Sequence, residues 1–330
     1  MSESRSAAYV AANSALIDQA LSSKPLDGPF ALLDFPDIRN VGDSAIWLGE
    51  MAYLRRRGRV PAYVSTMGSY DVEELKRRVP AGPILLRGGG NFGDLWPGHQ
   101  AFRERVMADF PDRQIIQMPQ SIHFSSDEAC AKAADAIARH GAFDLLVRDR
   151  QSQQIARDTL GCEATLCPDM AFAIGPVEPL GQPEIPVLAM LRADKEKSGR
   201  ASGDGLPDTI PVEDWIEESA GPVRRARWLG RLSALGSLDR GAIRLASYKA
   251  VARQRFDRGR RQLSRAEKVI TDRLHVHIIS LLMGKPHAVL DNSYGKIRHF
   301  REAFPEPEGL TFAATSLAEA YDWARSSDSQ

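Results

Sequence analysis

The chain has 330 residues, of which 43% are hydrophobic and 26% charged, and its 43 Lys and Arg balance its 43 Asp and Glu. These values are ordinary for globular proteins and exclude wholesale disorder. The length exceeds the ~150 residues typical of one domain, so two domains with a ligand cleft between them are expected. Zero net charge gives no general attraction to nucleic acid, so no nucleic-acid partner is predicted and any contact with a membrane has to be local.

The cysteines and the N-terminal segment bear on the compartment. Cys130, Cys162 and Cys167 lack metal-ligand spacing and fit reduced thiols in a cytosolic protein better than a disulfide framework. Residues 1–27 are polar and helical in pattern without a long apolar run, which predicts neither a signal peptide nor a membrane anchor. We therefore expect a cytoplasmic protein without structural zinc.

Short apolar segments alternate with helical or loop segments through the first half of the chain. The predicted strands are residues 30–34, 59–64, 83–86, 114–118 and 144–147, with an amphipathic helix at 43–57. This alternation is typical of an α/β fold with a parallel sheet and helices on both faces. Ligands of such sheets bind beyond the carboxyl ends of strands, where the unusual residues fall: 40–43, 88–94, 119–121 and 148–149.

The second half repeats this pattern after a segment rich in proline and glycine at 180–186. We take that segment as the boundary between two domains, residues 1–180 and 181–330. The elements predicted beyond it are strands at 187–191, 268–270 and 287–290, a helix at 278–283 and a terminal helix at 317–325. The terminal helix is a candidate for packing back onto the first domain.

The most informative segment is the Thr-Asp-Arg-Leu-His-Val-His sequence that starts at Thr271. Thr271 or Asp272 can cap a helix there, which places Arg273 and His275 near a helix N-terminus, where backbone N–H groups and the helix dipole favour an anion. A lone histidine is more often an ordinary core residue, and this alternative applies to His275 and His277 alike. The neighbouring cation favours an anionic ligand beside His275.

A glycine-rich segment runs from Arg87 to Asp94 directly after a predicted strand. Gly89, Gly90 and Asn91 therefore lie where a ligand or another backbone approaches closely, although a tight turn explains the glycines equally well. The segment lacks the Lys-Ser/Thr ending of a Walker A loop and departs from the dinucleotide fingerprint.

The first predicted strand is followed by a similar loop that contains Asn40, Gly42 and Asp43. Gly42 permits close backbone approach. Capping of the following helix is the favoured role of Asp43, and contact with a ligand is the alternative.

Further cations follow predicted strands, namely Arg148, Arg192, Lys195 and Lys296. A guanidinium matches phosphate or carboxylate oxygens bidentately, so Arg148 is a candidate anion ligand. Pairing of Arg148 with Asp149 or another acid is the alternative. Arg192 and Lys195 can share an anion or belong to a solvated charge run.

Residues 223–268 contain 14 Lys and Arg against three acids, a strong local excess of positive charge. Such clusters attract anionic headgroups or a lipid-linked pyrophosphate, at roughly 1 kcal/mol per charge near a membrane surface. Peripheral contact of residues 224–261 with the cytoplasmic face of the inner membrane is therefore one interpretation. Solvated helix faces are the commoner one. The stretch lacks the interleaved aromatic residues of a single-strand nucleic-acid platform.

Together, in their order along the chain, these segments resemble the polysaccharide pyruvyl transferase family, closest to its exopolysaccharide ketal-pyruvyltransferase branch. The matching segments span about residues 30–300 and are Asn40-Val-Gly-Asp43, Gly88-Gly-Gly90, Met118-Pro-Gln-Ser121, Val147-Arg-Asp149 with Ser152, Cys167-Pro-Asp169, Leu191-Arg192-Ala-Asp194-Lys195-Glu196, Asp272-Arg-Leu-His275 and Tyr294-Gly-Lys296. The arginine-rich stretch at 223–261 is less familiar in this family.

The resemblance implies two Rossmann-like domains facing across a cleft, a GT-B-like arrangement with the acceptor on the first domain and the donor on the second. It implies transfer of a pyruvyl unit from phosphoenolpyruvate to two hydroxyls of a sugar in an exopolysaccharide or its lipid-linked precursor, giving a cyclic ketal and phosphate. Phosphoenolpyruvate is then a co-substrate. No cofactor or metal is expected, because no acidic cluster resembles a divalent-cation site.

The residues suit this reaction, because phosphoenolpyruvate carries a phosphate and a carboxylate close together and needs several fixed cations. Histidine is the natural acid or base at neutral pH, and His275 is predicted to be catalytic. The predicted donor-binding residues are Arg148, Arg273, Lys296 and Arg192. Further candidates for substrate contact are Asn40, Asp43, Gly89, Gly90, Asn91, Gln120, Ser121 and Lys195.

Two alternatives remain open at this point. A nucleotide-sugar glycosyltransferase would use the same architecture and cations at a helix N-terminus. A catalytically silent scaffold would use the basic helices to recruit a polysaccharide assembly complex.

Overall fold

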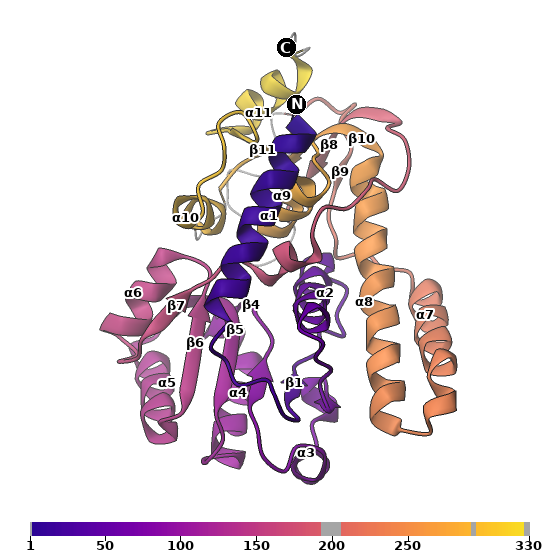
Figure 1. Cartoon of the computed structure of the whole chain (residues 1–330). Coiled ribbons are helices and arrows are strands. Elements are labelled where there is room, and N and C mark those ends of the chain that lie inside the picture. Colours follow the sequence, from indigo (N-terminus) through magenta and orange to yellow (C-terminus); the bar gives the residue numbers. More distant parts are fainter. Residues whose placement is uncertain (1, 193–205, 292–294, 327–330) are drawn as a thin grey trace.

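Two parallel β-sheets form the centre of the computed structural model, which describes residues 2–192, 206–291 and 295–326 (Figure 1). The chain is a mixed α/β protein, as the alternating pattern predicts. None of the helices within these ranges has the length and apolarity needed to cross a membrane.

The first sheet has the strand order β2-β1-β3-β5-β6-β7, with β4 paired to β5. Its strands are β1 (Ala31–Leu33), β2 (Tyr63–Val64), β3 (Ile84–Leu86), β4 (Gly89–Gly93), β5 (Ile115–His123), β6 (Phe143–Val147) and β7 (Ala164–Leu166). Its helices are α2 (Val41–Arg56), η1 (Met67–Ser69), α3 (Val72–Arg78), α4 (Pro97–Asp109), α5 (Asp127–His140), α6 (Arg150–Asp158) and η2 (Met170–Ile174). The glycine-rich segment is thus not a tight turn: it extends as β4 alongside β5.

The second sheet has the order β12-β11-β10-β8-β9. Its strands are β8 (Ile185–Met190), β9 (Val212–Glu213), β10 (Ala266–Thr271), β11 (His287–Val289) and β12 (Phe312–Ala313). Its helices are α9 (Leu274–Leu282), α10 (Lys296–Ala303) and α11 (Leu317–Arg325). The helix after β10 begins earlier than the apolar run at 278 suggests, which places His275 in its first turn. The terminal helix α11 packs against β10 and β11 of its own sheet.

The two sheets are joined by a common hydrophobic core. Helix α1 (Ser2–Ala20) contacts both η2 and α9, and its Tyr9 hydroxyl donates a hydrogen bond to the Phe304 carbonyl (2.7 Å). Phe172 of η2 stacks on Phe300 of α10, with ring centroids 5.8 Å apart. Contacts therefore cross between the two halves of the chain, from α1 and η2 to α9 and α10.

The arginine-rich stretch forms a helical hairpin of α7 (Ala220–Ser233), η3 (Leu235–Ser237) and α8 (Arg240–Ser264). Gly230 lets the two helices approach closely, because a Cβ there would lie 2.7 Å from the Ala246 carbonyl oxygen. Helix α8 packs against α2 of the first half, while α7 lies on the outer side (Figure 1).

Candidate functional site

A cavity of about 610 Å³ lies where carboxyl-terminal ends of strands from both sheets meet. The predicted site residues that line it are Asn40, Asp43, Gly90, Asn91, Arg148, Arg192, Arg273, His275 and Lys296. They come from both halves of the chain. The topology therefore brings together residues that are up to 256 positions apart, from Asn40 to Lys296.

His275, Arg148 and Asp169 form a connected group at this cavity. The His275 Nε2 lies 3.3 Å from Oδ2 of Asp169, and the same oxygen accepts a hydrogen bond from Nη1 of Arg148 at 2.5 Å. Burial alone would raise the pKa of Asp169, but His275, Arg148 and the Ala171 N–H hold that pKa well below its usual range. Asp169 is therefore a buried anion that joins the imidazole to the guanidinium.

The position of the His275 ring is set by close contact with helix α2. Asn40 caps that helix by accepting a hydrogen bond from the Gly42 N–H (3.0 Å). A Cβ on Gly42 would lie 2.5 Å from Cγ and Nδ1 of His275. Glycine at this position therefore lets the first turns of α2 and α9 meet, which directs the imidazole into the cavity.

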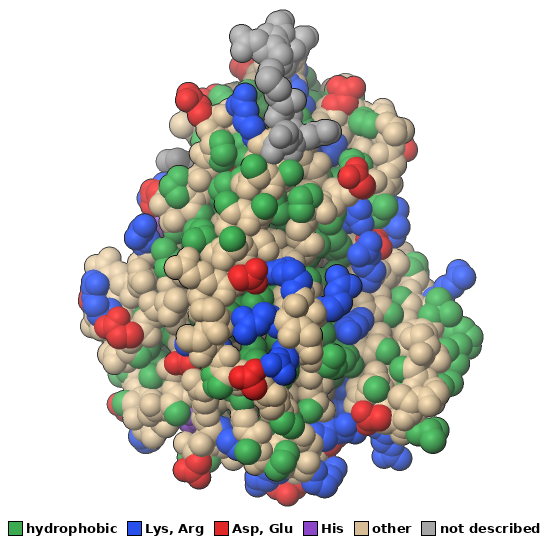
Figure 2. Space-filling view, in the orientation of Figure 1, with side chains coloured by type: hydrophobic (Ala, Val, Ile, Leu, Met, Phe, Trp, Pro, Cys, Tyr) green, Lys and Arg blue, Asp and Glu red, His purple; other side chains and the backbone are tan. Residues whose placement is uncertain are grey.

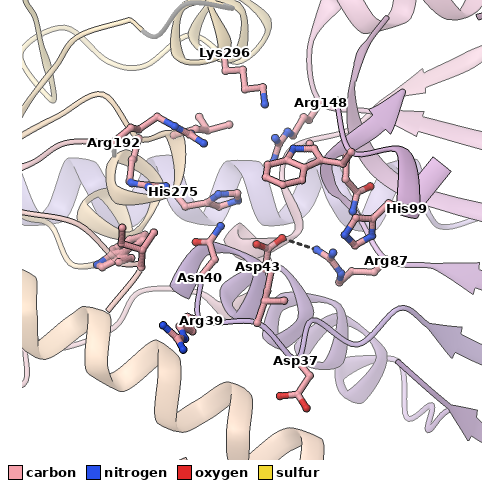
Figure 3. A pocket seen from close by; sticks show the side chains of 18 residues that line it. Asp37, Arg39, Asn40, Asp43, Arg87, His99, Arg148, Arg192, His275 and Lys296 are labelled. Carbon is pink, nitrogen blue, oxygen red and sulfur yellow. Dashed lines mark hydrogen bonds and ion pairs between the residues drawn. The ribbon is translucent and has the colours of Figure 1, made fainter. Parts of the chain in front are cut away.

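Cations converge near Gly90 of β4. A Cβ on Gly90 would lie 2.9 Å from Nη2 of Arg148 and 3.3 Å from Nζ of Lys296. Figure 3 shows Arg192, Arg148 and Lys296 directed from different elements toward the space beside His275. This arrangement suits a small ligand with more than one negative group.

Arg273 lines the cavity, but an acid from the second sheet engages it. Its Nη2 donates to Oδ2 of Asp214 at 2.6 Å, and both side chains are nearly buried. The adjacent Asp272 accepts the Arg192 N–H (2.8 Å), and burial raises the pKa of Asp272 to about 6. Arg273 thus links the start of α9 to the segment after β9, and it also lines the cavity.

A second group of paired charges lies at the base of the cavity around Arg87. This buried guanidinium donates to Oδ1 of Asp43 (2.8 Å) and Oδ2 of Asp34 (3.3 Å), and Asp34 also contacts Nδ1 of His99 (3.0 Å). Burial opposes ionisation of Asp34, yet Arg87 and His99 lower its pKa overall. The favoured capping role of Asp43 is wrong, because Asn40 is the cap and Asp43 pairs with Arg87.

Two predicted substrate contacts lie beneath the lining. Gln120 is fully buried and bonds both backbone and side chain of Asn91 (3.1 and 2.9 Å). Ser121 donates to Asp149 (2.7 Å) and accepts from Nε of Arg148 (3.0 Å). Both side chains thus hold lining residues of this cavity, and Ser121 also lines a second pocket together with Lys296.

Two further residues singled out in the sequence, Gly89 and His277, do not line the cavity. Gly89 is in β4 beside Arg87 and Asp43, behind the lining. Lys195 lies outside the described residues. His277 is a core residue as its alternative states, because it is fully buried with Nδ1 2.8 Å from Nε2 of His287.

Several lining residues escape sequence reasoning, namely Asp37, Ile38, Arg39, Arg87, Trp96, His99, Trp215, Leu274 and Ile216. Trp96 and His99 come shortly after the glycine-rich segment, which was the available signal. The signal for Asp169 is the Cys167-Pro-Asp169 segment of the family resemblance, since the strand before it, β7, is not among the predicted strands. Trp215 follows β9, a strand that was not predicted.

Comparison with known proteins identifies relatives across most of the chain. A family model described as polysaccharide pyruvyl transferase matches residues 40–294. Pyruvyl transferase 1 of Schizosaccharomyces pombe is 35% identical over 300 residues, covering 83% of this chain and 69% of that protein. The putative pyruvyl transferase EpsO of Bacillus subtilis is 30% identical over 288 residues, covering 86% and 87%.

A solved structure shows a similar fold. The crystal structure of an uncharacterized protein from Klebsiella pneumoniae matches with a TM-score of 0.56 over 92% of this chain and 99% of that one. Its sequence identity is 16%, so this likeness concerns the fold alone.

Proposed function

Because the chain belongs to the polysaccharide pyruvyl transferase family, we propose that it transfers a pyruvyl group from phosphoenolpyruvate to two hydroxyls of a sugar. The products would be a cyclic pyruvate ketal and inorganic phosphate. The observation that carries the proposal is the Asp169-linked pair of His275 and Arg148 beside Lys296, because it combines a proton carrier with fixed cations.

The proposal includes a GT-B-like arrangement with a Rossmann-like domain on each side of the cavity. Residues 1–180 would hold the acceptor, and residues 181–330 the donor. Two parallel sheets whose strand ends meet at one cavity support this division. Arg148 would then reach the donor from the acceptor side, since Arg148 and Lys296 both lie close to Gly90.

Donor binding would rest on Arg148, Lys296 and Arg192. Phosphoenolpyruvate carries its phosphate and carboxylate on the same carbon, so cations from separate elements can hold both groups at once. Asp169 balances part of the Arg148 charge and fixes its guanidinium before the donor arrives. Arg273 would add positive potential near the helix N-terminus at Leu274.

The reaction needs balanced proton transfers. A proton goes to the methylene carbon of phosphoenolpyruvate, which turns it into a methyl group and lets the first sugar hydroxyl bond to the central carbon. The C–O bond to phosphate then breaks, and the second hydroxyl closes the ketal. Of the two hydroxyl protons, one replaces the proton delivered to carbon and the other leaves with phosphate.

His275 is the group placed to carry these protons. As an imidazolium it would donate to the methylene carbon, and as an imidazole it would then accept a hydroxyl proton. Asp169 would orient the ring through its contact with Nε2. Cations around Gly90 would stabilise the departing phosphate, without a cofactor or metal in the proposal.

The acceptor is proposed to be a sugar of an exopolysaccharide or of its lipid-linked precursor, handled at the cytoplasmic face of the membrane. Trp96 and Ile216 line the cavity and offer apolar surface for a sugar ring. Acceptor hydroxyls would meet Asn40, Asn91 and His99 on the first half of the chain.

The test is to incubate the protein with phosphoenolpyruvate and a panel of nitrophenyl or lipid-linked glycosides. We expect phosphate release that needs both substrates, and a glycoside mass increased by one pyruvate with loss of water. Binding of a nucleotide sugar with no binding of phosphoenolpyruvate would favour a glycosyltransferase instead. Absence of any reaction across the panel together with absence of phosphoenolpyruvate binding would contradict the proposal.

A further inference from the structure

An unusual exposed surface lies on helix α7 and on the η3 turn that follows it in the hairpin. We call it the apolar edge, and its residues are Trp228, Leu229, Leu232, Leu235 and Leu238. Trp228 is 59% exposed and Leu238 is 90% exposed. Figure 2 shows hydrophobic side chains gathered along this side of the molecule, where α7 lies in Figure 1. A contiguous set of large apolar side chains in water marks a contact surface.

The inner face of the hairpin is already satisfied, so the apolar edge is not a packing face left over by chance. Val223 and Gly230 are buried against α8. Arg244 pairs with Glu74 (2.8 Å) and Arg255 with Glu218 (2.9 Å), which fixes α8 against its neighbours. Both arginines therefore form ion pairs within the protein and are not free to bind an outside partner.

A second set of cations flanks the apolar edge, and we call it the basic flank: Arg224, Arg225, Arg231 and Arg240. All four are exposed, and none forms an ion pair with an acid within residues 2–192, 206–291 and 295–326. Arg224 and Arg225 lie one helical turn before Trp228, and Arg231 lies one turn after it. Positive charge therefore lies beside the apolar edge on α7 and, through Arg240, at the start of α8.

We propose that the apolar edge and basic flank dock this protein onto the surface of a membrane that contains anionic lipids. A helix with Trp and Leu on one face and Arg beside them lies in the interface plane, with its apolar side chains among the acyl chains and its cations at the headgroups. Charge complementarity selects this occupant over a neutral apolar partner, because the four arginines of the basic flank would have to lose their water without gaining counter-charges.

The hairpin also connects this surface to the cavity. Nη2 of Arg227 in α7 donates to Asp37 at 2.8 Å, and Nη1 of Arg255 in α8 donates to the same carboxylate at 3.2 Å. Asp37 lines the cavity. A docked hairpin would hold the cavity mouth near the lipid surface, where a lipid-linked acceptor resides; this last step rests on the proposed function, whereas docking itself does not.

The experiment is sedimentation of the full chain with vesicles of phosphatidylcholine alone or mixed with phosphatidylglycerol. We expect sedimentation with the mixed vesicles only. The W228S/L232S variant should lower the affinity for the mixed vesicles roughly ten-fold or more, because its apolar side chains no longer insert. The R224Q/R225Q variant should lower this affinity roughly 25-fold, and a higher salt concentration should lower it further.

Two matched variants control for general effects of exposed residues. Val60→Ser removes an exposed apolar side chain outside the hairpin, and R57Q/R139Q removes two exposed arginines elsewhere. Both should sediment like the parent chain. Thermal melting of every variant checks that the fold is intact.

Equal sedimentation of the W228S/L232S and control variants would overturn the proposal, as would absence of sedimentation by the parent chain. Light scattering adds one further outcome: a dimer that W228S/L232S converts to a monomer, without vesicle binding by either, would assign the apolar edge to a second copy of the chain. Transferase activity is not read in this experiment, so its failure and that of the proposed function are distinguishable.

Discussion

Oδ2 of Asp169 lies between two functional side chains, 3.3 Å from Nε2 of His275 and 2.5 Å from Nη1 of Arg148. The carboxylate is almost completely buried, whereas the imidazole reaches the cavity. One anion thus fixes the proposed proton carrier and the proposed donor ligand at the same time. Neither side chain can move without disturbing the other.

Replacement of His275 tests the role of the imidazole directly. His275→Ala should lower kcat by roughly 10²- to 10⁴-fold or more, because proton delivery to the methylene carbon is lost. Phosphoenolpyruvate should still bind, since Arg148, Lys296 and Arg192 remain. Calorimetric titration and phosphate release measure the two effects separately, and near-normal turnover would remove His275 from the mechanism.

Asp169→Asn tests whether the carboxylate acts through His275. With saturating phosphoenolpyruvate, kcat should fall by roughly 10²-fold, because the ring loses its orienting anion. The H275A/D169N double variant should be about as slow as His275→Ala alone, since both changes remove one unit. Multiplicative losses would show that Asp169 acts independently. Asp158→Asn, at an exposed acid that pairs with Arg157, is the matched control.

Gly42→Ala tests the close contact between α2 and the His275 ring. The added methyl group would lie 2.5 Å from the ring, so the imidazole has to move. A displacement of ~1 Å in an active site can cost roughly 10²-fold in rate. We expect kcat to fall by more than the affinity for phosphoenolpyruvate, with some loss of melting temperature, because the methyl group would also lie 2.6 Å from Cβ of His275. Gly98→Ala, where a Cβ meets nothing within 4 Å, should leave kcat unchanged.

The sequence predicts which residues meet better than how they meet. Parallel strands place their carboxyl ends at one edge, so Arg148, His275 and Lys296 could be expected at a common cleft. The part played by Asp169 depends on η2 packing against α2, where Gly49 lets the Met170 carbonyl approach. That contact joins segments far apart in sequence and leaves no local periodic signal.

The arginine-rich stretch shows the same limit. Its composition predicts a local positive surface, but ion-pair partners decide which arginines face outward. Arg255 is buried between Glu218 and Asp37, whereas Arg224 is exposed. Both occupy helical positions in a basic run, so only tertiary structure distinguishes them.

Gly90→Ala tests the convergence of cations on the donor. The new methyl group would lie 2.9 Å from Nη2 of Arg148 and 3.3 Å from Nζ of Lys296, in the space proposed for phosphoenolpyruvate. KM for phosphoenolpyruvate should rise roughly ten-fold or more, with a smaller change in KM for the sugar. Initial-rate kinetics with each substrate varied in turn measure this difference. An increase only in KM for the sugar would mean that phosphoenolpyruvate binds elsewhere.

Glu50 of α2 gives a prediction for stability. Its Oε1 accepts the Gly88 N–H (2.8 Å), while its Oε2 is buried without a hydrogen-bond partner in the described part of the chain. Burial raises the pKa of Glu50 to about 8 from the ordinary 4.5, against opposing effects of the Gly88 N–H and Arg87. The folded carboxyl therefore holds a proton between about pH 4.5 and pH 8 that the unfolded chain releases.

The contribution of Glu50 to the free energy of unfolding must then fall as the pH rises from about 4.5 to about 8, and it levels off above about pH 8. Glu50→Gln keeps an acceptor for Gly88 and cannot ionise. Its melting temperature should exceed that of the parent chain at pH 8.5 and approach it at pH 5. Other titrating groups are common to both chains, so the difference isolates Glu50. The exposed Glu178→Gln should show no such trend, and a Glu50→Gln difference independent of pH would mean that the carboxyl is ionised throughout.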